Sequence, residues 1–135
     1  MKIILDTHIL VWFHTADKRL GANTLNLLTD NHNTIYYSSL SIWESEIKHQ
    51  LHPDIFPFSG RWLDDLCRTS GMIILPLMPE HIFLLGTLHY SESAPSQHKD
   101  PFDKMLICQA KAENMKFCTH DNLLPFYGED CIMYV

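Results

Sequence analysis

Two acidic residues follow short apolar segments of the chain. Asp6 comes directly after Ile3-Ile4-Leu5, and Asp121 comes just after Lys116-Phe117-Cys118-Thr119. Short apolar runs that end on polar residues are typical of strands buried on both faces of a parallel sheet. Ligands of such sheets collect at the carboxyl ends of the strands, which is where both acids stand. A lone acid in this place more often starts a turn or caps a helix, so a catalytic role for Asp6 depends on the rest of the chain.

A third acid lies in the apolar stripe of the helix predicted from about Ser41 to Leu51. The stripe repeats at the helical period of 3.6 residues and consists of Leu40, Trp43, Ile47 and Leu51. Glu44 falls within it and is expected to face the core, whereas Glu46 is rotated by roughly 160° and is expected to face water. The alternative for Glu44 is an ion pair with Lys48 one turn later, which suits an exposed helix surface better than an apolar face.

A fourth acid stands near the start of the last long helix. Asp100 followed by Pro101 is itself a helix start, with Asp as the N-cap and Pro in the first helical position, so we leave Asp100 out of the chemistry. Asp103 instead heads an apolar stripe formed by Leu106, Ile107 and Ala110, and is expected to point toward the sheet. The alternative is an acid favoured there only by the helix dipole.

Gathered at one sheet edge, these four carboxylates need a cation. Two carboxylates about 4 Å apart repel by roughly 4 kcal/mol at an effective dielectric near 20, so a cluster is stable only if protonated or neutralised. Oxygen ligands favour Mg²⁺ or Mn²⁺ over zinc. Such ions activate water and stabilise charge on phosphoryl oxygens. The predicted chemistry is therefore metal-assisted phosphodiester hydrolysis by Asp6, Glu44, Asp103 and Asp121.

The elements that must position these acids form one domain over residues 1–135. Further strands are predicted over 35–37, 72–75 and 131–135. A helix opening at Pro79 is expected to bury Ile82, Leu85 and Leu88, and residues 91–99 are expected to form a loop. The order β-α-α-β-α-α-β-α-α-β-β predicts a three-layer α/β/α sandwich with a mostly parallel central sheet.

Composition excludes several classes of protein. A formal net charge of −6 argues against a protein that coats nucleic acid through a general basic field. The four cysteines have no CxxC spacing and lie in apolar segments, so we expect buried free thiols in a cytoplasmic protein, without disulfides or a zinc knuckle. Most of the nine histidines are expected on the surface. No signal peptide or transmembrane segment is predicted.

The four acidic motifs, in this order and spacing, resemble PIN-domain proteins, and in particular the VapC-like toxins of bacterial toxin–antitoxin pairs. The resemblance covers essentially the whole chain. It is carried by Leu5-Asp6-Thr7-His8 with Leu10-Val11-Trp12, Ser39-Leu40-Ser41-Ile42-Trp43-Glu44 with Lys48, Asp100-Pro101-Phe102-Asp103-Lys104-Met105-Leu106-Ile107 with Gln109-Ala110, and Thr119-His120-Asp121.

This resemblance implies a divalent-metal endoribonuclease that acts on RNA, is inhibited by a small cognate antitoxin, and is usually a homodimer. Its acidic positions match Asp6, Glu44, Asp103 and Asp121, and its strand-end hydroxyl matches Thr119. Close relatives often carry Arg where this chain has Lys104, so a bidentate phosphate grip is lost here. Lys104, Lys48 and Lys99 are expected to surround the acidic site and contact phosphate; ordinary solvated lysines are the alternative.

Three other functions fit part of the pattern. A haloacid-dehalogenase-type phosphatase also ends its first strand on Asp, but wants a second Asp at the position of His8. A receiver-like pocket that becomes phosphorylated would not call for Glu44 and Asp103 in helix faces. A non-catalytic PIN-like binding module would not need all four acids intact. The RNA target, the antitoxin and the number of metal ions do not follow from the sequence.

Overall fold

The strand that ends on Asp6 lies at the centre of a five-stranded sheet. The computed structural model describes residues 1–135, and its sheet has the order β3-β2-β1-β4-β5 with every neighbouring pair parallel. The mostly parallel sheet predicted from the sequence is confirmed. The strands are β1 (Lys2–Leu5), β2 (Thr34–Ser38), β3 (Ile73–Leu75), β4 (Lys116–Thr119) and β5 (Ile132–Tyr134).

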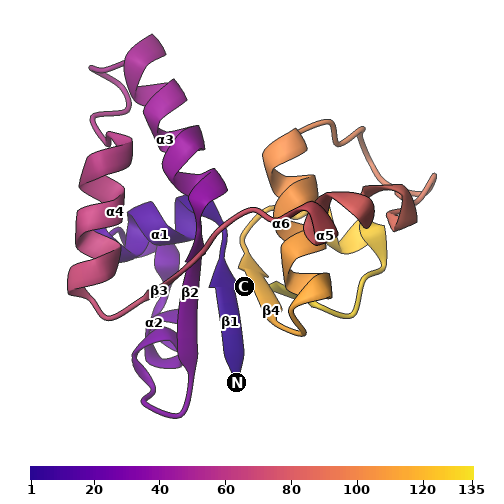
Figure 1. The fold of residues 1–135 in the computed structure, drawn as a ribbon, viewed down its shortest axis with the longest axis horizontal. Helices are drawn as coiled ribbons and strands as arrows, with labels where there is room; N and C mark the ends of the chain where they lie inside the picture. The colour runs from indigo at the N-terminus through magenta and orange to yellow at the C-terminus, as the bar shows by residue number, and fades with distance from the viewer.

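Helices cover both faces of the sheet, which confirms the three layers (Figure 1). Ile3 and Leu5 of β1 point to one face and pack in a cluster with side chains of the first, second and fourth helices, whereas Ile4 points to the other and packs with the last long helix. The helices are α1 (Thr7–Thr15), α2 (Ala22–Thr29), α3 (Ser39–Leu51), α4 (Gly60–Thr69), α5 (Pro79–Phe83) and α6 (Pro101–Ala112), with 3₁₀ turns η1 (Lys18–Leu20), η2 (Leu85–Thr87) and η3 (Leu124–Tyr127).

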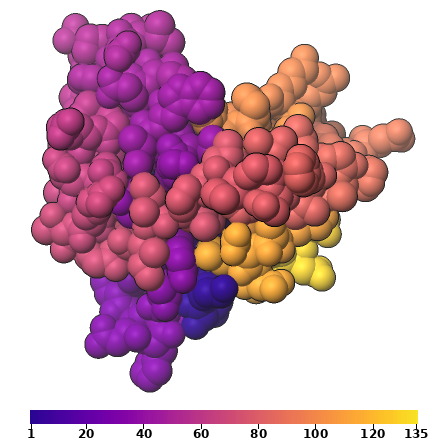
Figure 2. Space-filling view, viewed as in Figure 1, coloured from indigo at the N-terminus to yellow at the C-terminus, as the bar shows by residue number.

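Two of the helices that begin at the carboxyl edge of the sheet have side-chain caps. Ser38, the last residue of β2, caps α3 by accepting the Leu40 N–H at 3.0 Å. Asp100 caps α6 by accepting the Phe102 N–H at 2.8 Å, as predicted. The space-filling view shows the surface indented between the purple α3 segment and the orange residues near the start of α6 (Figure 2). The carboxyl end of β1 lies beneath this indentation.

The apolar stripe predicted for α3 is wrong in part. Trp43 is 60% exposed and Leu51 is 68% exposed. The buried side of the helix is instead formed by Leu40, Ser41, Glu44 and Ser45. Leu51 ends the far half of α3, which extends beyond the sheet (Figure 1), whereas Trp43 packs edge-on against Phe102 of α6. Glu46, predicted to face water, is half-buried and accepts the Gly60 N–H at 2.9 Å, which joins α3 to the start of α4.

The helix at Pro79 is shorter than predicted and turns a different face inward. It ends at Phe83, and Ile82 and Leu85 are exposed. The buried residue is His81, whose Nδ1 accepts the Met78 N–H at 3.0 Å. This capping bond sets the face that α5 turns toward the core.

Other predictions are confirmed. Residues 91–99 form a loop without helix or strand, and all four cysteines are free, with Cys67, Cys108 and Cys118 buried. None of the helices combines the length and the apolar character that crossing a membrane would need.

Candidate metal centre

Asp6 is fully buried at the end of β1. Its backbone N–H donates to the Cys118 carbonyl at 2.9 Å, continuing the β1–β4 ladder. Its side-chain Oδ2 accepts the Thr119 hydroxyl at 2.6 Å, whereas Oδ1 is buried with no hydrogen-bond partner. Burial raises the pKa of Asp6, an effect that His8 and the Thr119 hydrogen bond oppose.

Thr119 holds the ends of two strands together. Besides donating to Asp6, its hydroxyl oxygen accepts the Asp121 N–H at 3.1 Å. The Asp121 carboxylate is fixed by the Leu123 N–H, which donates to Oδ1 at 2.9 Å, so Oδ2 remains available. Asp6 and Asp121 thus follow neighbouring parallel strands, as the sequence predicted, and the predicted strand-end hydroxyl lies between them.

Glu44 reaches the site from the buried side of α3 and is 4% exposed. The Thr7 hydroxyl donates to its Oε1 at 2.7 Å, and lies 2.9 Å from the Ser41 hydroxyl. Lys48 Nζ lies 2.8 Å from Glu44 Oε2. Burial lowers the pKa of Lys48, but the hydrogen bond and charge of Glu44 outweigh it and the net direction is upward. The ion pair and the buried position, which the sequence analysis treated as alternatives, occur together.

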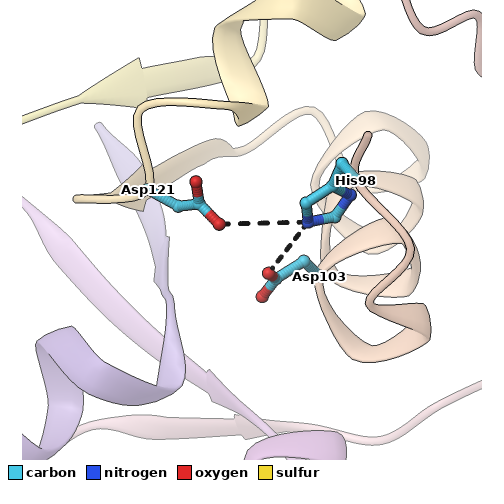
Figure 3. A group of neighbouring side chains, drawn as sticks. All are labelled: His98, Asp103 and Asp121. Carbon is cyan, nitrogen blue, oxygen red and sulfur yellow. Dashed lines mark hydrogen bonds and ion pairs between the residues drawn. The ribbon is translucent and has the colours of Figure 1, made fainter. Parts of the chain in front are cut away.

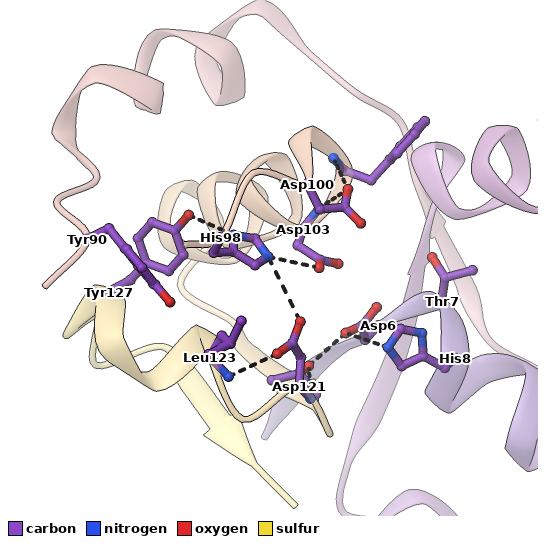
Figure 4. Close-up of polar contacts among 12 residues, drawn as sticks. Asp6, Thr7, His8, Tyr90, His98, Asp100, Asp103, Asp121, Leu123 and Tyr127 are labelled. Carbon is purple, nitrogen blue, oxygen red and sulfur yellow. Dashed lines mark hydrogen bonds and ion pairs between the residues drawn. The ribbon is translucent and has the colours of Figure 1, made fainter. Parts of the chain in front are cut away.

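Asp103 points from the first turn of α6 toward the sheet, as predicted, and is 4% exposed. Burial, followed by the charges of Asp6, Asp100, Glu44 and Asp121, raises its pKa to about 9. All four predicted acids therefore influence one another electrostatically, and Asp103 holds its proton at neutral pH without a cation. Figure 4 shows Asp6 and Asp121 facing Asp103 across the site.

A histidine that the sequence analysis did not select completes this side of the site. His98 is 8% exposed, and its Nε2 lies 3.2 Å from Asp103 Oδ2 and 3.9 Å from Asp121 Oδ2 (Figure 3). Its Nδ1 lies 2.8 Å from the Tyr127 hydroxyl. The residue lies in the loop before α6, where no periodicity marks a buried position. In the sequence, the only sign that His98 lies near the site is its position two residues before the N-cap residue Asp100.

Three side chains of the site, one of them His98, have ligand atoms that lie close together. Two of the four acids lie outside this group. One ligand atom each from His98, Asp103 and Asp121 lies within 4.8 Å of the others. Asp6 and Glu44 do not belong to this group. Figure 4 shows that the Asp6 oxygen without a hydrogen-bond partner points into the space between Asp103 and Thr7. A buried carboxylate oxygen without a donor is costly, and a cation among these acids would satisfy it. The residues present therefore fit a divalent cation.

The three predicted lysines flank the acids on opposite sides. Lys48 contacts Glu44. Together with Phe56 and Phe58, it also lines a cavity of about 420 Å³. Lys99 and Lys104 line a second cavity, of about 340 Å³, together with His98. One of the three lysines therefore contacts a site acid, and the other two share a cavity with His98.

Comparisons with known proteins agree with this architecture. Residues 3–127 match the family model of the PIN domain. The chain is similar to one chain in the crystal structure of VapBC2 from Rickettsia felis bound to a DNA fragment from their promoter, with a TM-score of 0.68, 21% identity, and coverage of 100% of this chain and 98% of that one.

A second similar structure is VapBC-1 from nontypeable Haemophilus influenzae, with a TM-score of 0.60, 19% identity, and coverage of 90% of this chain and 87% of that one. No curated protein sequence matches significantly. At these identities, the likeness to solved structures shows a shared fold.

Proposed function

The chain belongs to the PIN domain family, and we propose that it is a divalent-metal-dependent endoribonuclease, the toxin of a cytoplasmic toxin–antitoxin pair. In this proposal Mg²⁺ or Mn²⁺ binds among Asp6, Glu44, Asp103 and Asp121, and RNA is the substrate. When bound, the cation supplies an activated water and stabilises charge on the phosphoryl oxygens.

The observation that carries the proposal is the unpartnered Oδ1 of Asp6. It is buried in a group of carboxylates, one of which has its pKa raised to about 9 by burial and by the other acids. A fold stabilised only by its own contacts would not bury such an oxygen without a donor. A cation that binds there explains both the free oxygen and the grouping of the acids.

The protein's own contacts orient the acids for this task. Thr119 fixes Asp6 Oδ2 and the backbone of Asp121, so their remaining oxygens face the site. Thr7 holds Glu44 Oε1 in the same way. Such supporting hydrogen bonds set ligand direction and basicity.

Positive charge for the substrate comes from the flanking lysines. Lys48, Lys99 and Lys104 are partly or fully exposed, so their ammonium groups can reach phosphates of a bound RNA strand. Lysine acts on phosphate as a point charge rather than as a two-pronged donor. The site therefore fixes the strand less rigidly than arginine would.

We further propose a small antitoxin as protein partner and a homodimer as the assembled state. The support is that both similar structures are VapBC complexes. Large apolar side chains are also exposed side by side on α5, where Ile82 is 46% and Phe83 is 77% exposed, and exposed apolar patches commonly mark protein contacts. Light scattering of the chain, alone and co-expressed with the product of a small adjacent reading frame, tests both assignments.

The main alternative is a PIN-like module that binds proteins without catalysis. The haloacid-dehalogenase-type phosphatase is disfavoured because the family match is to the PIN domain and His8 stands where that chemistry wants Asp. Intact acids with an unpartnered oxygen favour catalysis over a purely structural role.

Cleavage of labelled RNA by the purified full chain tests the function. Activity is expected with Mg²⁺ or Mn²⁺ and absent with EDTA, and Asp103→Asn is expected to abolish it because the amide keeps the shape of the side chain and removes its charge. Asp65→Asn, on the exposed side of α4, is the matched control and should cleave at the wild-type rate.

Circular dichroism and thermal unfolding must show that Asp103→Asn is folded. Cleavage by this variant at the wild-type rate, or undiminished cleavage in EDTA, would refute the metal-dependent mechanism. Metal binding without cleavage of any RNA would favour the non-catalytic alternative.

A further inference from the structure

We propose that His98 binds the metal directly, through Nε2, together with Asp103 and Asp121. This inference rests on the proposed function, because that function supplies the cation. It adds to the four acids a nitrogen ligand that the acidic motifs do not contain, and it predicts a preference for Mn²⁺ over Mg²⁺.

Two of the three separations between the ligand atoms fit one cation, and all three atoms lie within 4.8 Å of one another. His98 Nε2 lies 3.2 Å from Asp103 Oδ2 and 3.9 Å from Asp121 Oδ2. With metal–ligand bonds of about 2.1 Å, two ligands of one ion lie about 3.0 to 4.2 Å apart, depending on the angle between them. Both pairs fall inside this range without any movement of the side chains.

The environment of His98 selects the form of the ring that can bind a metal. The ring is buried, and its two nitrogens face different partners. A neutral ring has one N–H and one lone pair. With Nδ1–H donated to the Tyr127 hydroxyl oxygen at 2.8 Å, the Nε2 lone pair points at the two carboxylates. Metal-binding histidines commonly donate their other ring nitrogen in this way.

The second, independent sign of a ligand is the buried Asp6 Oδ1, which has no partner and points into the space between Asp103 and Thr7 (Figure 4). The His98 group and this oxygen therefore lie on two sides of Asp103. A cation held by the His98 group would also be attracted by the Asp6 charge.

His8 is the competing nitrogen at the opposite end of the site. Its Nε2 lies 3.8 Å from Asp6 Oδ2, but the side chain is 38% exposed and only one acid is nearby. A single carboxylate and an exposed ring fix the direction of a lone pair poorly. His98 contacts two acids and is held by Tyr127, so we assign the ligand to His98.

Mn²⁺ is the probe that distinguishes these residues. Electron spin-echo envelope modulation of the full chain loaded with Mn²⁺ detects ¹⁴N bonded to the ion. The wild type and His8→Asn are expected to show imidazole modulation, and His98→Asn is expected to lose it. Incorporating ¹⁵N-histidine should replace the ¹⁴N signal and so confirm its source.

Titration calorimetry gives a second measurement that does not depend on cleavage. Imidazole nitrogen suits transition metals better than Mg²⁺, so His98→Asn should weaken Mn²⁺ binding by about tenfold or more and Mg²⁺ binding by less. Tyr127→Phe leaves the ring in place and removes its support, so it should keep the ¹⁴N modulation and weaken Mn²⁺ binding less than His98→Asn does.

The outcomes separate this inference from the proposed function. If Mn²⁺ binds and the wild type shows no imidazole modulation, the metal site stands and the assignment of His98 is wrong. Modulation that survives His98→Asn and disappears in His8→Asn would also overturn the assignment. If no Mn²⁺ binds at all, the metal-dependent function itself fails.

Discussion

Lys48 Nζ lies 2.8 Å from Glu44 Oε2, so one of the four site acids is paired with a cation of the protein itself. Glu44 is buried and Lys48 is partly exposed, and the pair is therefore neither a surface ion pair nor a fully buried one. It partly neutralises Glu44 when no metal is present. A metal ion bound among the acids would compete with Lys48 for the same carboxylate.

We expect Lys48→Met to lower the free energy of unfolding of the metal-free protein by about 1 kcal/mol. Removing one partner of a buried pair commonly costs about 3–5 kcal/mol, but solvent near the exposed ammonium screens this pair and reduces the effect. Mg²⁺ should recover most of the loss, because the cation then neutralises Glu44. Urea unfolding in EDTA and in Mg²⁺ measures both quantities.

Lys99→Met is the control for this prediction. Lys99 is exposed and makes no ion pair or hydrogen bond, so its loss should change stability by less than about 0.5 kcal/mol. Equal effects of the two substitutions in EDTA would show that the Glu44–Lys48 pair does not stabilise the metal-free protein.

The proton on Asp103 predicts how stability depends on pH. Its pKa is raised from 3.8 to about 9 in the folded chain without metal. A raised folded pKa contributes stability that is fully present below pH 3.8 and is lost as pH rises toward 9. We therefore expect the thermal midpoint in EDTA to fall between pH 5.5 and pH 9 in the wild type.

Asp103→Asn cannot lose a proton there, so its thermal midpoint should fall less over the same range. Its midpoint at pH 9 should also equal or exceed that of the wild type, because clustered carboxylates repel. If the thermal midpoints of the two proteins fall equally with pH, Asp103 is not the group whose loss of a proton lowers the stability.

The site acids that were predicted correctly from the sequence are those whose positions are fixed by residues close to them in the chain. Asp100 and Pro101 mark the start of α6 by their own capping preferences, so Asp103 was placed correctly relative to the helix. Asp6 and Asp121 follow strands whose apolar runs end sharply. In each case the signal lies within a few residues of the acid, and the parallel sheet brings the strand ends together.

Burial that depends on tertiary packing was predicted less accurately from the sequence. Glu44 is buried, but the reason given for it was wrong in part, because Trp43 and Leu51 of the supposed core stripe are exposed. Helical periodicity shows which residues share a face and not how far the sheet extends beneath it. His98 was missed because the path of its loop over the sheet edge depends on contacts with Tyr127 and Asp103.

The Thr119 hydroxyl is expected to strengthen metal binding, although it is not itself one of the proposed ligands. Thr119→Val removes the donor to Asp6 and the acceptor of the Asp121 N–H, so two ligands lose their orientation. Mn²⁺ affinity should fall by about tenfold, as it commonly does when a supporting hydrogen bond is lost. Titration calorimetry measures this change.

Thr119→Ser keeps the hydroxyl and is the matched comparison. It should bind Mn²⁺ within about threefold of the wild type, a difference of roughly 0.6 kcal/mol. If serine and valine weaken binding equally, the loss comes from the packing of the missing methyl group and not from the hydrogen bonds.

Under the proposed function, a protein with a net charge of −6 must bind RNA. Long-range attraction is unfavourable, so binding must depend on the metal and on the local lysines Lys48, Lys99 and Lys104. Each phosphate contact contributes about 0.7 to the slope of log affinity against log salt for single strands. Two or three contacts predict a slope of about 1.4 to 2.1, and Lys104→Ala should reduce it by about 0.7.

Fluorescence anisotropy with Ca²⁺ in place of Mg²⁺ measures the slope while slowing cleavage. Lys116→Ala, at the amino-terminal start of β4 and hence at the opposite edge of the sheet, should leave the slope unchanged. A much steeper slope, or none of the expected change when the three lysines are replaced together, would exclude this RNA path. If the slope does not change, the cavity lined by Phe56 and Phe58 beside Lys48 is the next place to test, because bases stack on aromatic side chains.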